Sequence, residues 1–154
     1  MKATATAPEV VASRPSRQEK YNGMNWISQY KRLAIYLRDG LACVWCGATV
    51  EQEGTQLSLD HVQAYSHGGS DDPSNLVTCC MKCNRSRGNR SKETFAAVVA
   101  RRLGNVVTQE RILANIYNAR RRQVELHYQT AKDLVKRRGS CFAALQSNEL
   151  QGRS

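Results

Sequence analysis

The sequence predicts a small α+β domain that is stapled by a metal ion. Three observations support this prediction. Apolar residues recur at helical spacing between Trp26 and Leu37, two strand-like runs read LSLDHV and NLVTCC, and the chain carries two Cys-x-x-Cys pairs. A chain of 154 residues has room for one such domain with a modest core and an extension at each end.

The first third of the chain predicts a disordered arm, a helix and a turn. Residues 1–20 are rich in Ala, Thr, Pro, Ser and charge without periodicity, which is typical of disorder. From Asn25 a helical pattern begins, and Gly40 offers its end. One face of this helix collects the apolar residues Trp26, Tyr30, Leu33 and Leu37. The run CVWCG that follows is predicted to form a tight turn.

Two short strands joined by a long loop are predicted next. LSLDHV alternates apolar and polar residues, and NLVTCC has the composition of a second strand. The segment between them, QAYSHGGSDDPSN, has the Gly, Asp, Pro and Ser content of a loop. A basic helix is predicted from about Lys82 until Gly88.

Helices are predicted for the remainder of the chain. Ser91 is a candidate cap for a helix that ends near Gly104. A longer helix is predicted from Thr108, because no Gly or Pro interrupts the chain before Gly139, and it would extend about 45 Å. Residues 101–138 hold ten Lys or Arg against three Asp or Glu. This basic surface is either a DNA-backbone contact or a solvated face. The long helix could also pair with a second copy in a homodimer, although Arg120–Arg122 would interrupt the seam.

The charge of the chain indicates a polyanionic partner. Lys and Arg outnumber Asp and Glu by 23 to 13, a formal net charge of +10. Nucleic acid is the first candidate, with a basic tail or a membrane surface as alternatives. No apolar run is long enough to span a bilayer and no secretory signal is evident, so we expect a cytoplasmic protein without a membrane partner.

The cysteine spacing predicts a structural zinc site. Tetrahedral zinc takes four ligands, and two Cys-x-x-Cys turns supply them and leave no position open for chemistry. The predicted ligands are Cys43, Cys46, Cys80 and Cys83. The alternative is four unliganded thiols. Cys79 could replace Cys80 but breaks the spacing, so we expect Cys79 to be a buried strand residue and Cys141 a free thiol in the tail.

Residues 32–88 resemble the HNH endonuclease family. The resemblance rests on RLAIYLRDGLACVWCG, then LDHV, then GGSDDPSNLVTCCMKCNRSRG. It implies a ββα-metal core, two antiparallel strands and a helix around a catalytic cation, in an HNH nuclease domain at residues 21–90 with a helical basic C-terminal extension at 91–154. By the same resemblance the function is metal-dependent hydrolysis of phosphodiester bonds in double-stranded DNA.

The resemblance also assigns roles to individual residues. His61 would be the general base, because an imidazole titrates near working pH. Asp60 and Asn84 would hold Mg²⁺ or Mn²⁺, with Asn84 standing where the family's name implies a histidine, and Asn75 would brace the loop and orient the base. Consecutive strand residues point to opposite faces, so Asp60 and His61 could ligate one ion only where the strand bends or ends.

Two alternatives remain open from the sequence. Arg85 and Arg87 could grip neighbouring phosphates or could be ordinary solvated charges. The whole chain could be a non-catalytic zinc-stapled DNA-binding module, in which His61 would be a hydrogen-bonded strand histidine. His67 and His127 are expected to be surface residues.

Overall fold

The centre of the molecule is a two-stranded antiparallel sheet. The computed structural model describes residues 26–50, 56–147 and 149–150, and the arm predicted at residues 1–20 lies outside them. Strand β1 (Leu57–His61) pairs with β2 (Leu76–Cys80), with Leu57 opposite Cys80 and His61 opposite Leu76. The predicted strands and the α+β class are confirmed. The loop between the strands contains two short 3-10 turns, η2 (Tyr65–His67) and η3 (Pro73–Asn75).

The predicted N-terminal helix forms as α2 (Gln29–Arg38), capped by the Ser28 side chain. Its buried surface is wider than the sequence pattern indicated, because Ile35 and Tyr36 are also fully buried. Trp26 lies before the helix and is 38% exposed instead of joining the apolar face. The helix is therefore enclosed by the sheet on one side and by the C-terminal helices on the other.

The next three helices follow the predicted starts. Helix α3 (Met81–Arg87) continues directly from β2. Helices α4 (Lys92–Arg102) and α5 (Gln109–Arg121) begin at the side-chain caps Ser91 and Thr108. Each cap side chain accepts a hydrogen bond from a backbone N–H that has no partner within its helix.

The prediction of one long helix from Thr108 to Gly139 is wrong. Helix α5 ends at Arg121, Arg122 adopts an extended backbone, and the chain continues through η4 (Glu125–His127), α6 (Tyr128–Arg138) and α7 (Cys141–Gln146). The break allows the two halves to bury their apolar faces in different cores, Ile116 in one and Leu134 in the other. No 45 Å helix is therefore available for pairing with a second copy.

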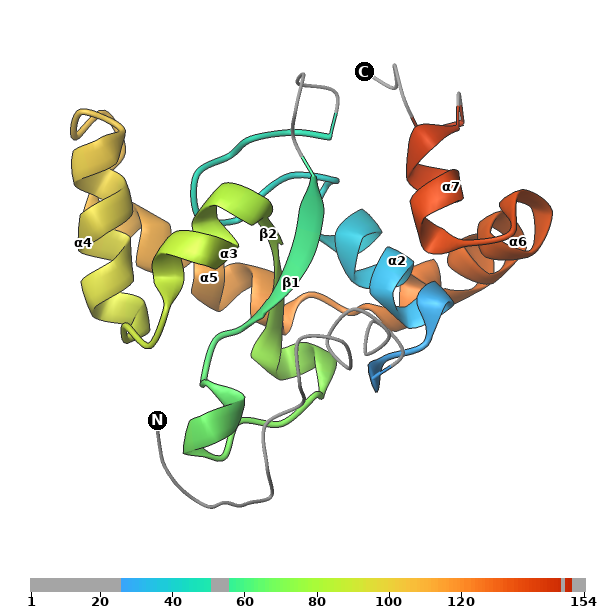
Figure 1. Cartoon of the computed structure of the whole chain (residues 1–154), viewed down its shortest axis with the longest axis horizontal. Coiled ribbons are helices and arrows are strands. Elements are labelled where there is room, and N and C mark those ends of the chain that lie inside the picture. The colour runs from blue at the N-terminus through green and yellow to red at the C-terminus, as the bar shows by residue number, and fades with distance from the viewer. Residues whose placement is uncertain (1–25, 51–55, 148, 151–154) are drawn as a thin grey trace.

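Two hydrophobic cores lie on the two sides of the sheet. The first joins α2, α6 and α7 to Leu57, Leu59 and Leu76. The second joins the cysteine turn, α4 and α5 to Val77 and Cys79, so that every residue of β2 is buried. Figure 1 shows α4 and α7 at opposite ends of the molecule with the strands between them.

The two remaining cysteines belong to these cores. Cys79 is fully buried in β2, as expected. Cys141 is a free thiol, as expected, but it is buried at the first turn of α7 and does not lie in a tail. Among the described residues, no helix combines the length and the apolarity needed to cross a membrane.

Candidate functional site

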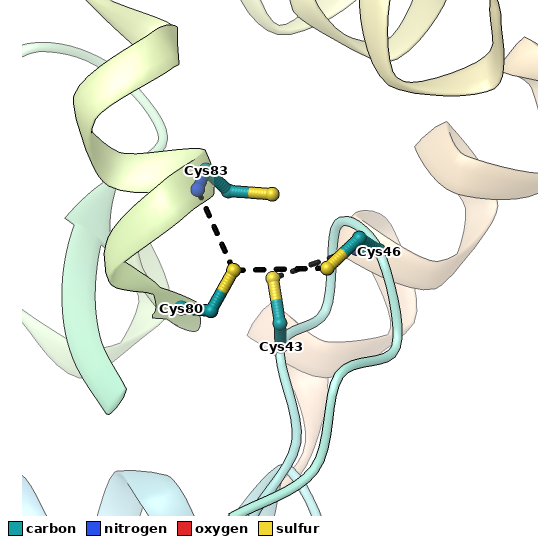
Figure 2. Close-up of side chains that lie close together, drawn as sticks. All are labelled: Cys43, Cys46, Cys80 and Cys83. Carbon is teal, nitrogen blue, oxygen red and sulfur yellow. Dashed lines mark hydrogen bonds between the residues drawn. The ribbon is translucent and has the colours of Figure 1, made fainter. Parts of the chain in front are cut away.

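The four predicted zinc ligands converge on one point. Their sulfur atoms all lie within 4.8 Å of one another, and Cys46 Sγ is 3.7 Å from Cys80 Sγ. A tetrahedral zinc with Zn–S bonds of about 2.3 Å separates its sulfurs by about 3.8 Å, so the cluster has dimensions suited to such an ion. Figure 2 shows two sulfurs arriving from the turn after α2 and two from the start of α3. The four cysteines are therefore positioned to bind a metal such as zinc.

Hydrogen bonds to sulfur support this cluster. The backbone N–H of Cys46 donates to Cys43 Sγ, and that of Cys83 donates to Cys80 Sγ, each at 3.4 Å. Hydrogen bonds with the Cys43 and Cys83 thiols lower the pKa of Cys46 to about 2. The hydrogen bond with Cys46 raises the pKa of Cys43 to about 12. Sulfurs this close share their protons, and only a cation would allow all of them to be thiolates together.

A cation from a distant helix also reaches the cluster. Arg102, in the last turn of α4, donates from Nη2 to Cys83 Sγ at 2.8 Å and from Nη1 to Ser86 Oγ at 3.4 Å. Sequence reasoning missed this contact, because Arg102 appeared only as one charge within a basic helix. Its position near the sulfurs depends on how α4 is placed relative to α3.

Asp60 faces the inner side of β1 and is nearly buried. Its Oδ2 accepts hydrogen bonds from Trp45 Nε1 at 3.0 Å and from the guanidinium of Arg87. Burial raises the pKa of the Asp60 carboxyl, and the charge and hydrogen bond of Arg87 oppose that rise. Oδ1 accepts no hydrogen bond from any described residue. One carboxylate oxygen is thus committed to the protein and the other is available.

Asn84 lies on the turn of α3 that covers the same side of β1. Its Nδ2 donates to Ser58 Oγ at 2.9 Å, and Ser58 precedes Asp60 by two residues on the strand. Side chains two residues apart on a strand point to one face, so Asn84 and Asp60 share the space between β1 and α3. Within the described part of the chain, Asn84 Oδ1 also accepts no hydrogen bond.

His61 projects from the opposite face of β1. Its Nε2 lies 2.7 Å from Asp71 Oδ1, and its side chain is 22% exposed. The rings of Trp26 and Tyr65 flank the imidazole, with centroid distances of 4.9 and 6.3 Å. Asp71 was not identified from the sequence, because an acid in the loop GGSDDPSN is indistinguishable from ordinary turn chemistry.

Asn75 ties together the ends of the loop between β1 and β2, residues 62–75. Its Oδ1 accepts from Gln63 N at 2.9 Å, and its Nδ2 donates to Gln63 O at 3.0 Å and to Ser70 O at 2.8 Å. Gly69 lies against the same group, where an added Cβ would stand 1.8 Å from Gln63 O. The buried amide therefore fixes the loop that carries Asp71.

Two cations outside the loop also hold it. The buried guanidinium of Arg38 donates to Pro73 O at 3.0 Å and to Leu76 O at 2.7 Å, and pairs with Asp39. Arg120 Nε donates to Ser74 O at 2.6 Å from the end of α5. Helices on both sides of the sheet thus position η3.

The two predicted phosphate contacts differ in the structure. Arg85 is exposed on α3, as a phosphate contact requires. Arg87 is 5% exposed and donates to Asp60, to Val62 O at 2.9 Å and to Arg90 O at 3.0 Å. It is therefore neither a solvated charge nor a surface phosphate contact, because its hydrogen-bonding groups are directed into the protein.

Two short strands, a following helix and a four-cysteine cluster positioned to bind a metal define a small ββα domain. Residues 43–90 match the family model described as HNH endonuclease, so this part of the chain is an HNH endonuclease domain. The resemblance predicted from the motifs is confirmed.

A curated relative supports the same assignment. Over 75 residues the chain is 36% identical to a CRISPR-associated endonuclease Cas9 from Actinomyces naeslundii. The matched segment covers 47% of this chain and 7% of that protein. The chain thus spans a small fraction of the length of this relative. No solved structure matches the chain.

Proposed function

We propose that the protein is a metal-dependent DNA endonuclease that hydrolyses phosphodiester bonds at its HNH domain. The observation that carries the proposal is the His61 imidazole, which is held by Asp71 and partly open to water inside a domain of this family. Metal-assisted hydrolysis requires a base and a cation site. His61, the last residue of β1, is the candidate base on one face of the strand, and Asp60 with Asn84 is the candidate cation site on the other face.

His61 serves as the general base in this proposal. Nε2 lies 2.7 Å from the Asp71 carboxylate, and a neutral imidazole that donates its Nε2–H to this carboxylate has Nδ1 as its unprotonated nitrogen. No described residue hydrogen-bonds to Nδ1. The free nitrogen takes a proton from the attacking water, while Asp71 fixes the tautomer and the orientation of the ring.

Asp60 and Asn84 would hold the catalytic divalent cation. Each presents one oxygen that accepts no hydrogen bond within the described residues, and oxygen ligands are those that Mg²⁺ and Mn²⁺ prefer. The two residues therefore supply the donor type that such an ion takes, from one side of β1. When bound, the cation supplies positive charge that stabilises the phosphate and the leaving oxygen. Asn84 acts here as the variant of the family's third motif residue.

The remaining residues bind and brace. Asn75 keeps the loop closed so that Asp71 stays against His61, and Arg85 offers an exposed guanidinium to a neighbouring phosphate. The four cysteines hold a structural zinc, which joins the turn after α2 to α3 and takes no part in the chemistry.

The net charge of +10 supports double-stranded DNA as the partner. We propose residues 21–90 as the nuclease domain and 91–154 as a basic helical extension that packs on it. A cytoplasmic location and a homodimer stay predictions from the sequence. The helix proposed for pairing is interrupted within residues 108–139, because α5 ends at Arg121.

The direct test is relaxation of supercoiled plasmid by purified protein with Mg²⁺ or Mn²⁺. Wild type is expected to nick the plasmid, and His61→Ala is expected to lose activity by at least about 100-fold, the scale of a general base. His67→Ala is the matched control, because this histidine lies on the surface of the same loop. Equal cleavage by His61→Ala and wild type would remove His61 from the mechanism.

The same preparation separates the enzyme from the non-catalytic alternative. Asp60→Asn and Asn84→Ala should reduce cleavage and raise the Mg²⁺ concentration required, because each removes or weakens one oxygen ligand. If wild type binds DNA tightly and in a salt-dependent way but cleaves nothing with either ion, the chain is a zinc-stapled DNA-binding module.

A further inference from the structure

Two exposed aromatic side chains stand beside the proposed base. Among the described residues, six large hydrophobic side chains are exposed, and Trp26 (38%) and Tyr65 (57%) are the two that contact His61. The other tryptophan, Trp45, is 2% exposed. Exposed aromatic rings that gather at one site are characteristic of ligand binding, whereas apolar residues scattered singly over a surface are ordinary.

The two rings come from separate parts of the chain. Trp26 precedes α2, outside the segment that matches the family model, and Tyr65 begins η2 in the loop after β1. The Trp26 ring is tilted by 33° to the imidazole and the Tyr65 ring by 61°. The guanidinium of Arg32 lies 5.6 Å from the Trp26 ring centroid, so the indole is also supported from the body of the protein.

We propose that Trp26 and Tyr65 form a stacking platform for an unpaired nucleobase next to the scissile phosphate. This inference rests on the proposed function in one respect, namely that DNA reaches His61. Aromatic rings bind nucleobases through their faces and tolerate any base. In an intact duplex these faces are covered by neighbouring base pairs, so the platform requires a single-stranded or locally unpaired substrate strand.

The charges around the rings favour a base over a phosphate or another anionic group. Asp71 and Asp72 lie in the loop that carries Tyr65, and both carboxylates would repel a phosphate placed against the rings, whereas the guanidinium of Arg32 is engaged with the Trp26 ring itself. The neutral base is free of that repulsion, and the basic surface of the chain remains available to the backbone on either side of it. The proposed ligand of the two rings is therefore a nucleobase, the flat and uncharged part of a nucleotide.

Tryptophan fluorescence gives a direct test without added divalent metal, so that no cleavage occurs. A short single-stranded oligodeoxynucleotide is titrated into the full chain, alongside the same sequence as a duplex and inorganic polyphosphate. We expect the single strand to quench emission and the other two to quench little. Trp26→Phe should abolish the quenching, because Trp45 is buried. Quenching that persists in this variant, or that polyphosphate reproduces, overturns the platform.

Affinity for a labelled single strand provides a second readout. Trp26→Leu and Tyr65→Leu should each weaken binding about tenfold, within the range measured for base–aromatic stacking, while Tyr65→Phe retains it. Phe142→Leu is the matched control, since Phe142 is exposed on α7, away from His61. Affinities equal to that of the control, or equal binding of single strand and duplex by wild type, contradict the proposal.

The two proposals fail separately. Plasmid cleavage that depends on His61, together with unchanged binding in Trp26→Leu, overturns the platform and leaves the nuclease intact. Quenching that depends on Trp26, in a protein that cleaves no DNA with either ion, supports the platform and refutes the nuclease.

Discussion

The contact between Arg102 and the cysteine cluster predicts a measurable effect on metal affinity. Four thiolates around Zn²⁺ carry a formal charge of −2, and Arg102 lies 2.8 Å from one of the sulfurs. We therefore expect Arg102→Gln to weaken zinc binding while the four ligands remain in place.

The magnitude follows from the type and exposure of the contact. A hydrogen bond to a charged group contributes about 1.5–3 kcal/mol, and the partial exposure of Arg102 places it at or below the lower end of that range. A loss of about 1.4 kcal/mol corresponds to a tenfold increase in the zinc dissociation constant. Arg102→Lys should have a zinc dissociation constant between those of wild type and Arg102→Gln, because it keeps the charge without the planar guanidinium.

The assay is equilibrium competition for zinc with a chromogenic chelator, with total metal measured independently. Arg101→Gln is the control, because Arg101 is the adjacent residue of α4, carries the same charge and is exposed with no hydrogen-bond or ion-pair partner among the described residues. Equal zinc affinity in Arg102→Gln and Arg101→Gln would refute the reasoning, since the effect would then be one of net charge alone.

Three further predictions concern the stability of the protein and the loop between β1 and β2. Arg38→Met should lower the free energy of unfolding in urea by about 3 kcal/mol, the lower end for a broken buried ion pair, because Asp39 then keeps only the Thr78 N–H and the 3.8 Å contact with Arg122 among the described residues. Adding Asp39→Asn should lower stability by less than the sum of the single changes. Gly69→Ala should lower the free energy of unfolding by about 3 kcal/mol and reduce cleavage, because the added Cβ would lie 1.8 Å from the backbone oxygen of Gln63. Gly68→Ala should lower it by about 1 kcal/mol, because Gly68 has φ +85° but open space around it. Equal losses in the two glycine variants would contradict this. Cys43→Ser should release the metal and unfold the domain, and a folded zinc-free variant would show that the staple is dispensable.

Local sequence patterns predicted much of the fold. The caps Ser91 and Thr108 mark helix starts because a side-chain oxygen replaces a missing backbone acceptor, which requires only neighbouring residues. The alternation in LSLDHV predicted β1 for a similar reason. The break at Arg122 could not be predicted in this way, because helix propensity favours continuity and only the presence of two separate cores favours a bend.

For the candidate site, too, the sequence predicted the residue types but not their contacts. The motif pointed to Asp60 and His61, and the rule that successive strand residues alternate already placed them on opposite faces. What each side chain contacts was beyond the sequence. Arg87 was expected near phosphate and is instead buried against Asp60, and the partner of His61 proved to be Asp71 in the loop.

The sequence by itself determined the family resemblance, the four-cysteine cluster and the proposed pair Asp60 and His61, because these depend on residue types at short, fixed spacings. Only the tertiary structure decided which carboxylate holds His61, which arginine is buried and which reaches the metal cluster. Those contacts join residues such as Arg102 and Cys83 that are brought together by the packing of whole helices, and no local pattern encodes that packing.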